Sequence, residues 1–285
     1  MAEVDNAPVV STQWLADHLD APDLRILDGS WYLPVMERDP KADYEARHIP
    51  GARFFDINDV SDSNSNLPHM APPVEKFTSR MRDLGVGDGH RVVVYDGAGL
   101  FSAARVWWIF RLMGQRDVAV LDGGLPKWLA EGHPVEDMPP VIRERHMTAR
   151  RDAQLIRDVT QVAAASGFGT AQIVDARGAE RFRGDAPESR PGLRAGHIPN
   201  ARNLPFATLL KEDHTLKSES DLRAAFEAAG VDLNRPIITS CGSGVTAAIL
   251  SLALELVGHR NHALYDGSWV EWGACEDLKL ATGPA

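Results

Sequence analysis

One cysteine lies in a sequence context that could activate it. Cys241 begins the segment CGSGVTA, which follows a short apolar run and precedes a long apolar stretch. Glycines allow successive backbone N–H groups to converge, and a helix N-terminus adds partial positive charge. Both effects favour a thiolate, so Cys241 is predicted to be a nucleophile that could also hold a persulfide anion. The other cysteine, Cys275, has no such loop, and we expect it to be an ordinary free cysteine.

An internal repeat places a second version of this loop earlier in the chain. Three pairs of segments recur in the same order and at nearly the same separation: LD at 27–28 and VD at 174–175, HIPGA at 48–52 and HIPNA at 197–201, and LDG at 121–123 and YDG at 265–267. This regularity indicates two copies of one domain. Asp96 occupies the position of Cys241 in the first copy. A carboxylate cannot accept sulfur, so the first copy is predicted to be non-catalytic.

The elements that position these residues follow from hydrophobic patterning. Each copy has three short apolar runs typical of buried parallel strands, at 25–28, 92–95 and 118–121 and again at 172–175, 236–239 and 262–265. Helical stretches at 102–113 and 245–257 follow the second strand of each copy. The alternation predicts an α/β fold with a mainly parallel sheet flanked by helices in each copy. Ligands of such sheets bind beyond the carboxyl ends of the strands, where Asp96 and Cys241 are expected.

The length agrees with a duplicated architecture. A chain of 285 residues corresponds to about two domains at about 150 residues each. We expect the non-catalytic domain over 9–138, a linker over 139–152 and the catalytic domain over 153–285. The linker contains two adjacent prolines and four arginines, a composition typical of an exposed connection.

Composition excludes several classes of protein. The chain is 44% hydrophobic and 25% charged, as expected for a folded protein, and its net charge of −10 disfavours nucleic-acid and anionic-membrane partners. Two cysteines, an acidic N-terminal sequence MAEVDNAPVV and the lack of a long apolar run predict a cytoplasmic protein without a membrane span. No residue pair has metal-ligand spacing, and we expect neither a metal nor another cofactor.

These motifs together resemble the tandem rhodanese family of sulfurtransferases. The resemblance rests on HIP in each copy, CGSGVT at 241–246, YDGSWVEW at 265–272, FFDI at 54–57 and RVWW at 105–108. It implies two rhodanese-like domains and sulfur transfer, most similar to the members that act on 3-mercaptopyruvate and pass sulfur to a thiol, such as that of thioredoxin, or to cyanide. Members that use the compact thiosulfate dianion carry basic residues after the cysteine, whereas this sequence has the neutral Gly242 and Ser243, which favours mercaptopyruvate.

The resemblance also implies roles for particular residues. Arg181 and Arg190 match two arginines that bind the substrate carboxylate and carbonyl, for which a planar guanidinium is well suited. Ser243 matches a serine that donates a hydrogen bond to the carbonyl or the leaving enolate, and His69 matches its histidine partner. The acid of that family triad is replaced by Asn58, so His69 is predicted to position Ser243 rather than to relay a proton. The persulfide-cradling loop comprises Gly242, Ser243, Gly244, Val245 and Thr246.

Other functions remain as alternatives at this point. The nearest are a thiosulfate sulfurtransferase and a non-enzymatic persulfide carrier or redox-sensing module. The segment 242–247 also fits the dinucleotide fingerprint G-x-G-x-x-G/A, but too few residues follow it to complete a nucleotide-binding fold. A phosphatase of related fold needs an arginine where Ala247 stands.

Overall fold

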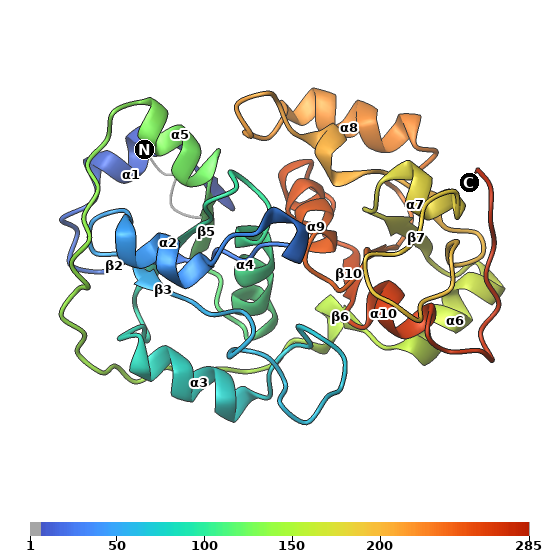
Figure 1. Cartoon of the computed structure of the whole chain (residues 1–285), viewed down its shortest axis with the longest axis horizontal. Helices are drawn as coiled ribbons and strands as arrows, with labels where there is room; N and C mark the ends of the chain where they lie inside the picture. The colour runs from blue at the N-terminus through green and yellow to red at the C-terminus, as the bar shows by residue number, and fades with distance from the viewer. Residues whose placement is uncertain (1–6, 285) are drawn as a thin grey trace. The chain divides into compact units, whose positions relative to one another are not determined.

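A computed structural model describes residues 7–284, which form two compact units with one five-stranded parallel sheet each (Figure 1). The first unit comprises the described residues up to 63, with Ala71–Asp152 and Glu212–Leu216. The second comprises Asn64–Met70, Ala153–Lys211 and residues 217–284. The strand orders, β1-β5-β4-β2-β3 and β6-β10-β9-β7-β8, are the same order counted from the first strand of each unit. The predicted fold class and its duplication are therefore confirmed.

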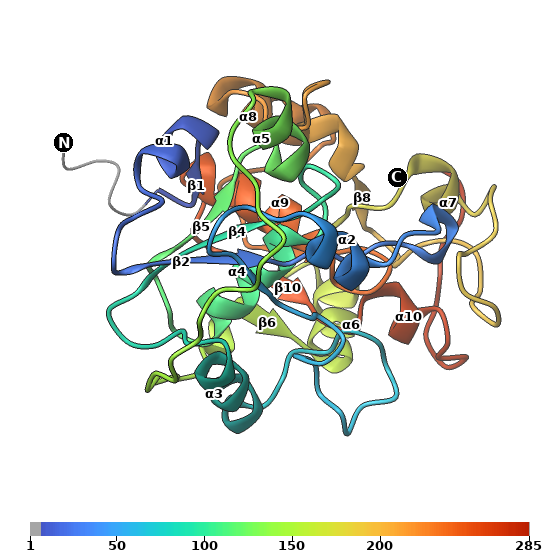
Figure 2. The ribbon, with the colours of Figure 1, turned by 60° about the vertical axis from the view of Figure 1, so that its left-hand side comes forward.

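The first unit follows the predicted alternation of strands and helices. Its elements are β1 (Val9–Val10), α1 (Thr12–Asp17), β2 (Leu24–Asp28), the 3-10 helix Pro34–Met36, α2 (Pro40–Ala46), β3 (Arg53–Phe54), α3 (Val74–Asp83), β4 (Arg91–Tyr95), α4 (Ala103–Leu112), β5 (Val118–Leu121) and α5 (Gly124–Ala130). The neighbouring strands β5, β4 and β2 lie side by side in Figure 2. All three strands expected from the apolar runs are present, and α4 lies within the predicted helix.

Helices cover both faces of the first sheet, which explains its nearly continuous apolar strands. Leu15 of α1, Tyr44 of α2 and Trp128 of α5 pack in one core on one face. On α3 and α4, Phe77 meets Phe110 edge to face with ring centroids 5.2 Å apart. The sheet therefore has no face left in water.

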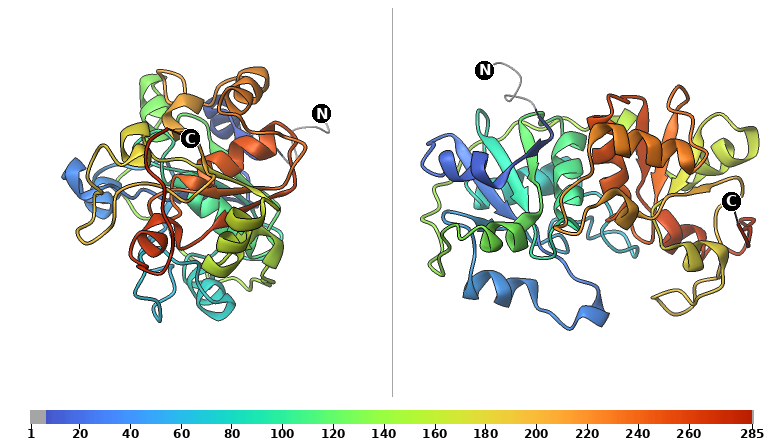
Figure 3. Two further views of the ribbon diagram at one scale, coloured as in Figure 1. Left: turned by 90° about the vertical axis from the view of Figure 1, so that its right-hand side faces the viewer. Right: turned by 90° about the horizontal axis from the view of Figure 1, so that it is seen from above.

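The second unit repeats this arrangement. Its elements are the 3-10 helix Ala153–Leu155, β6 (Ile156–Arg157), α6 (Val159–Phe168), β7 (Gln172–Asp175), α7 (Ala179–Arg183), β8 (Arg202–Asn203), the 3-10 helix Phe206–Leu209, α8 (Glu219–Ala228), β9 (Ile237–Ser240), α9 (Ala247–Leu256), β10 (His262–Tyr265) and α10 (Ser268–Trp272). Val162 of α6, Phe182 of α7 and Trp269 of α10 share one core. Helices lie on both sides of this sheet (Figure 3). Helix α9 contacts β9 and β10 and is buried from Ala247 to Glu255, as its apolar sequence predicts.

Two segments do not follow the simple division of the sequence into halves. The segment Asn64–Met70 belongs to the second unit by its contacts, although it lies in the first copy of the sequence. The segment 139–152 is mostly exposed but belongs to the first unit, because Met147 is buried and the Arg150 N–H donates to the Met113 carbonyl at 3.0 Å. The boundaries 9–138, 139–152 and 153–285 stay a prediction.

Within residues 7–284, no helix is long and apolar enough to cross a membrane. The N-terminal sequence behind the cytoplasmic prediction begins with residues 1–6, which lie outside the described residues.

Candidate active site

Cys241 lies directly after β9, at the expected end of the sheet, and α9 begins at Ala247. It is buried, and its loop is held from α10: the Cys241 N–H donates to Ser268 Oγ at 3.2 Å, and the Trp269 N–H donates to the Cys241 carbonyl at 3.0 Å. Gly244 has a φ of +79°, a conformation that favours glycine, which lets the chain turn into the helix. The loop thus fixes a buried cysteine at the start of a long helix.

The corresponding loop of the first unit shows what this helix start can hold. Asp96 is fully buried, and its carboxylate accepts four backbone N–H groups at 2.8–2.9 Å, those of Ala98, Phe101, Ser102 and Ala103. Converging amides at a helix N-terminus stabilise an anion. The first residues of α4 and α9, Ala103 and Ala247, correspond in the two copies. In the first copy, the position of the cysteine is therefore an anion-binding position occupied by the chain's own carboxylate.

Ser243 and His69 meet, although they are far apart in the sequence. His69 Nδ1 lies 3.1 Å from Ser243 Oγ, and both side chains are buried in the second unit. His69 has a φ of +62°, in the left-handed region that few non-glycine residues adopt. Asp59, the neighbour of Asn58, forms a two-bonded ion pair with Arg80. Asp59, which stands next to the Asn58 that replaces the acid of the family triad, is thus paired with Arg80.

The two predicted substrate arginines lie near Cys241. A β-carbon placed on Gly242 would lie 3.5 Å from Nη2 of Arg181, so this guanidinium reaches the cysteine loop. Burial lowers the pKa of Arg190, with an opposing electrostatic contribution from Cys241 and a further lowering by Arg181. Arg190 therefore lies within electrostatic range of both Cys241 and Arg181.

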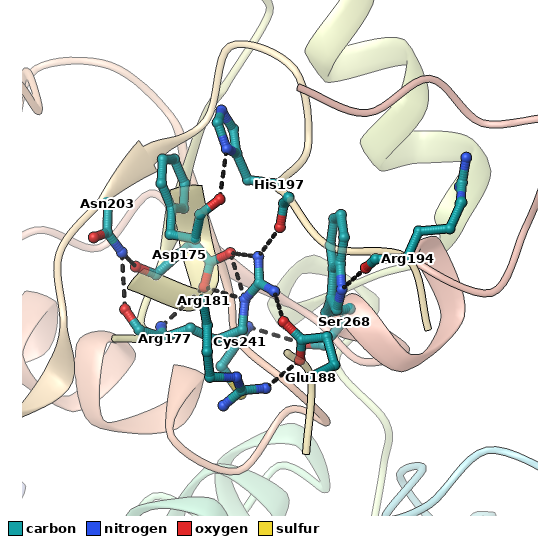
Figure 4. Close-up of polar contacts among 12 residues, drawn as sticks. Asp175, Arg177, Arg181, Glu188, Arg194, His197, Asn203, Cys241 and Ser268 are labelled. Carbon is teal, nitrogen blue, oxygen red and sulfur yellow. Dashed lines mark hydrogen bonds and ion pairs between the residues drawn. The ribbon is translucent and has the colours of Figure 1, made fainter. Parts of the chain in front are cut away.

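Two further residues, which the sequence did not assign to the site, also belong to it. The side chains of Arg177 and Glu188 are almost fully buried and form an ion pair at 2.8 Å, and the second oxygen of Glu188 binds Arg181 (Figure 4). Burial lowers the pKa of Arg177, but the Asp175 and Glu188 carboxylates raise it more, so the net shift is upward. A sequence signal exists for Arg177, since it follows by two residues the acid that ends a buried strand.

The histidines of the repeated HIP motif have the same contacts in both units. His48 Nδ1 lies 2.7 Å from the Tyr44 carbonyl, and His197 Nδ1 lies 2.8 Å from the Phe182 carbonyl. Each ring stacks on the aromatic residue whose carbonyl it contacts. Burial lowers the pKa of His197. This matched packing explains both histidines without a role in chemistry.

Away from Cys241, a cavity of about 480 Å³ opens at the amino end of β7 and is lined by Phe168, Arg202 and Arg235 among others. None of the predicted site residues lines it. Among residues 7–284, no group of three or more His, Cys, Asp or Glu side chains could share a metal ion.

A family model described as the Rhodanese-like domain matches residues 11–131 and 158–275, once in each copy. The chain belongs to the rhodanese family. The 3-mercaptopyruvate sulfurtransferase of Escherichia coli (strain K12) is 45% identical over 272 residues, which cover 95% of this chain and 96% of that protein. The thiosulfate sulfurtransferase of Bos taurus is 43% identical over 271 residues, covering 93% and 91%.

A solved structure agrees with these relatives. The crystal structure of the 3-mercaptopyruvate sulfotransferase SseA from Escherichia coli matches with a TM-score of 0.85 at 42% identity, covering 92% of this chain and 99% of that chain. Within this rhodanese-family chain, the copy that carries Cys241 also carries Arg181 and Ser243, whereas the other copy carries Asp96.

Proposed function

We propose that this rhodanese-family protein transfers the sulfur of 3-mercaptopyruvate to a thiol or cyanide acceptor through a persulfide on Cys241, and releases pyruvate. One observation carries the proposal: a buried cysteine at the start of α9, with the guanidinium of Arg181 against its loop. The physiological acceptor we propose is the thiol of a small dithiol protein such as thioredoxin.

The choice of substrate rests on charge next to the cysteine. The relatives named for mercaptopyruvate and for thiosulfate are almost equally similar to this chain, so overall identity does not separate the two substrates. Gly242 and Ser243 leave the cysteine loop without a basic side chain, and a compact dianion gains most from positive charge close to the accepting sulfur. Mercaptopyruvate places its single carboxylate away from its sulfur, where arginines can bind it.

In the first half-reaction, the Cys241 thiolate attacks the substrate sulfur. A sulfur–sulfur bond forms and the substrate carbon–sulfur bond breaks, so that its electron pair remains on carbon as the enolate of pyruvate. Arg181 and Arg190 bind the carboxylate and carbonyl, and the hydroxyl of Ser243, positioned by His69, donates to the oxygen on which charge develops. The enolate takes up the proton of the substrate thiol and leaves as pyruvate, so that the persulfide remains on Cys241 as an anion.

In the second half-reaction, an acceptor thiolate attacks the outer sulfur. A new sulfur–sulfur bond forms on the acceptor, the persulfide bond breaks, and Cys241 leaves as a thiolate. With cyanide as acceptor, the product is thiocyanate. The amides of the loop 242–246 stabilise the persulfide anion between the two steps, as the corresponding amides of the first copy stabilise the Asp96 carboxylate.

The proposal is tested by steady-state pyruvate release with mercaptopyruvate and a thiol, beside thiocyanate formation from thiosulfate and cyanide. We expect kcat/KM for mercaptopyruvate to exceed that for thiosulfate at least about tenfold. Cys241→Ser should abolish turnover, because the hydroxyl cannot carry the sulfur, and Cys275→Ser is the matched control that should retain it. A higher kcat/KM for thiosulfate would favour the thiosulfate alternative, and release of one equivalent of pyruvate per site would favour a carrier. Full turnover by Cys241→Ser would refute the mechanism.

A further inference from the structure

We infer that Glu188 is a positioning residue, which holds Arg181 in the orientation that binds the substrate carboxylate. The inference rests on the proposed function, because it assigns Arg181 to that carboxylate. It concerns a residue with no direct part in the chemistry described above.

The carboxylate of Glu188 joins two arginines of very different exposure. Its Oε1 accepts from Arg177 Nη1 at 2.8 Å, and its Oε2 accepts from Arg181 Nη2. The side chains of Arg177 and Glu188 are 1% and 2% exposed, whereas that of Arg181 is 30% exposed. Of these three side chains, only that of Arg181 can therefore contact a ligand from solvent, and the other two lie behind it.

Arg177 is fixed from several directions and serves as the anchor. Its Nε contacts both oxygens of Asp175 at 3.1 and 3.0 Å, and its Nη2 donates to Asp175 at 2.7 Å and to the Gly196 carbonyl at 2.9 Å. Its guanidinium carbon also lies 4.3 Å from the ring centroid of Trp269. Because Asp175 ends β7, a continuous set of contacts leads from the sheet through Arg177 and Glu188 to Arg181. A planar guanidinium held in this way loses less freedom when it binds a carboxylate.

The contact leaves part of the Arg181 side chain exposed to a ligand. Glu188 engages Nη2, and the side chain is still 30% exposed, whereas its Nε is buried and has no hydrogen-bond partner among the described residues. Glu188 also carries a negative charge, which by itself repels an anionic substrate. The two effects predict opposite results when the charge is removed: loss of positioning raises KM, whereas loss of repulsion lowers it.

The experiment compares Glu188→Gln with Asp185→Asn in the full-length protein. Asp185 is the matched control because it forms an exposed pair with Arg183, on the same helix as Arg181, at 2.6 Å. For Glu188→Gln we expect KM for mercaptopyruvate to rise about tenfold or more, the scale of one charge-assisted hydrogen bond, with kcat changed by less than about threefold. Asp185→Asn should leave both constants unchanged.

A KM for Glu188→Gln that is unchanged or lower would overturn the inference. So would a fall in kcat with an unchanged KM, since that result indicates loss of folded protein rather than of orientation. If Glu188→Gln does not fold, Glu188→Asp supplies the same test, because its shorter side chain cannot span both arginines and KM should still rise. Failure of the proposed function is distinguishable, because in that case the wild-type protein itself releases no pyruvate from mercaptopyruvate.

Discussion

Ser268 adopts a backbone conformation that is unfavourable for serine. Its φ is +49°, and the corresponding residue of the first copy is Gly124, with a φ of +55°. The following residue makes the same contact in both copies, since the N–H of Leu125 donates to the backbone carbonyl of Asp96 as that of Trp269 donates to the backbone carbonyl of Cys241, both at 3.0 Å. The serine thus retains a strained conformation where the first copy uses glycine. Its hydroxyl accepts from the Cys241 N–H and donates to the Tyr265 carbonyl. Strain at such a position indicates a functional contact.

We predict that Ser268→Gly separates stability from activity. Glycine relieves a strain of about 1–3 kcal/mol but removes the acceptor of the Cys241 N–H, so stability should be kept while kcat falls about tenfold or more. Ser268→Ala retains the strain without the hydroxyl and should lose both stability and activity. Thermal unfolding and steady-state pyruvate release measure the two effects. Wild-type kcat in Ser268→Gly would show that this hydroxyl does not position the cysteine.

At the scale of elements, the start of α4 is stabilised by a carboxylate inside the protein. The Oδ2 atom of Asp96 accepts the N–H groups of Phe101, Ser102 and Ala103, and all of these contacts are buried or partly buried. The Asp96 carboxylate accepts all three backbone N–H groups, so these donors at the helix start need no water as a partner. In the second copy, the loop that precedes α9 carries Cys241 in place of this carboxylate.

We expect Asp96→Asn to destabilise the first unit by about 2–3 kcal/mol, because an amide removes the charge and turns a donor toward backbone N–H groups. The matched control is Asp39→Asn, at the exposed start of α2, where Asp39 accepts from the N–H groups of Lys41 and Ala42. Asparagine caps helices as well as aspartate does, so this change should cost little. Urea unfolding compares the two variants, and equal losses would contradict the special role of Asp96.

At the scale of the whole molecule, the two copies differ at a buried acid. Among residues 7–284, Asp175 of the second copy is paired with an arginine, whereas its counterpart in the first copy, Asp28, is not. Asp175 ends β7 and pairs with Arg177. Asp28 ends β2, and its carboxylate accepts from the N–H and hydroxyl of Ser30 and from the hydroxyl of Tyr95. Burial raises the pKa of Asp28 to about 6, against an opposing effect of the Ser30 hydrogen bonds. The first unit therefore contains a buried carboxylate whose ionisation opposes folding.

This difference predicts how stability depends on pH. The folded state binds the Asp28 proton more tightly than the unfolded state does, so stability falls as pH rises from about 4 to about 6 and is level above that. A shift of about two pKa units corresponds to about 3 kcal/mol. Asp28→Asn should remove this part of the pH dependence, as measured by unfolding between pH 4 and pH 8. Asp17→Asn, at an exposed position of α1, is the control, and identical profiles for wild type and Asp28→Asn would contradict the prediction.

The sequence alone determined the duplicated α/β fold, because apolar runs and the repeat are local patterns that survive in the order of residues. It also determined the place of Cys241, since the end of a parallel strand and the start of a helix are fixed by those patterns. The glycines of the loop, and the absence of a basic side chain at positions 242 and 243, are likewise visible in the sequence itself.

The family resemblance implied that His69 is the partner of Ser243, and the tertiary structure decided how these and other distant residues meet. The segment 64–70 belongs to the second unit, which brings His69 to Ser243, and no local pattern encodes a contact across that separation. Glu188 and Arg177 appear in the sequence as two of many charged residues. Their burial distinguishes them, because a buried charge needs a partner of opposite charge. Arg177 has Glu188 as that partner, and Glu188 in turn orients Arg181.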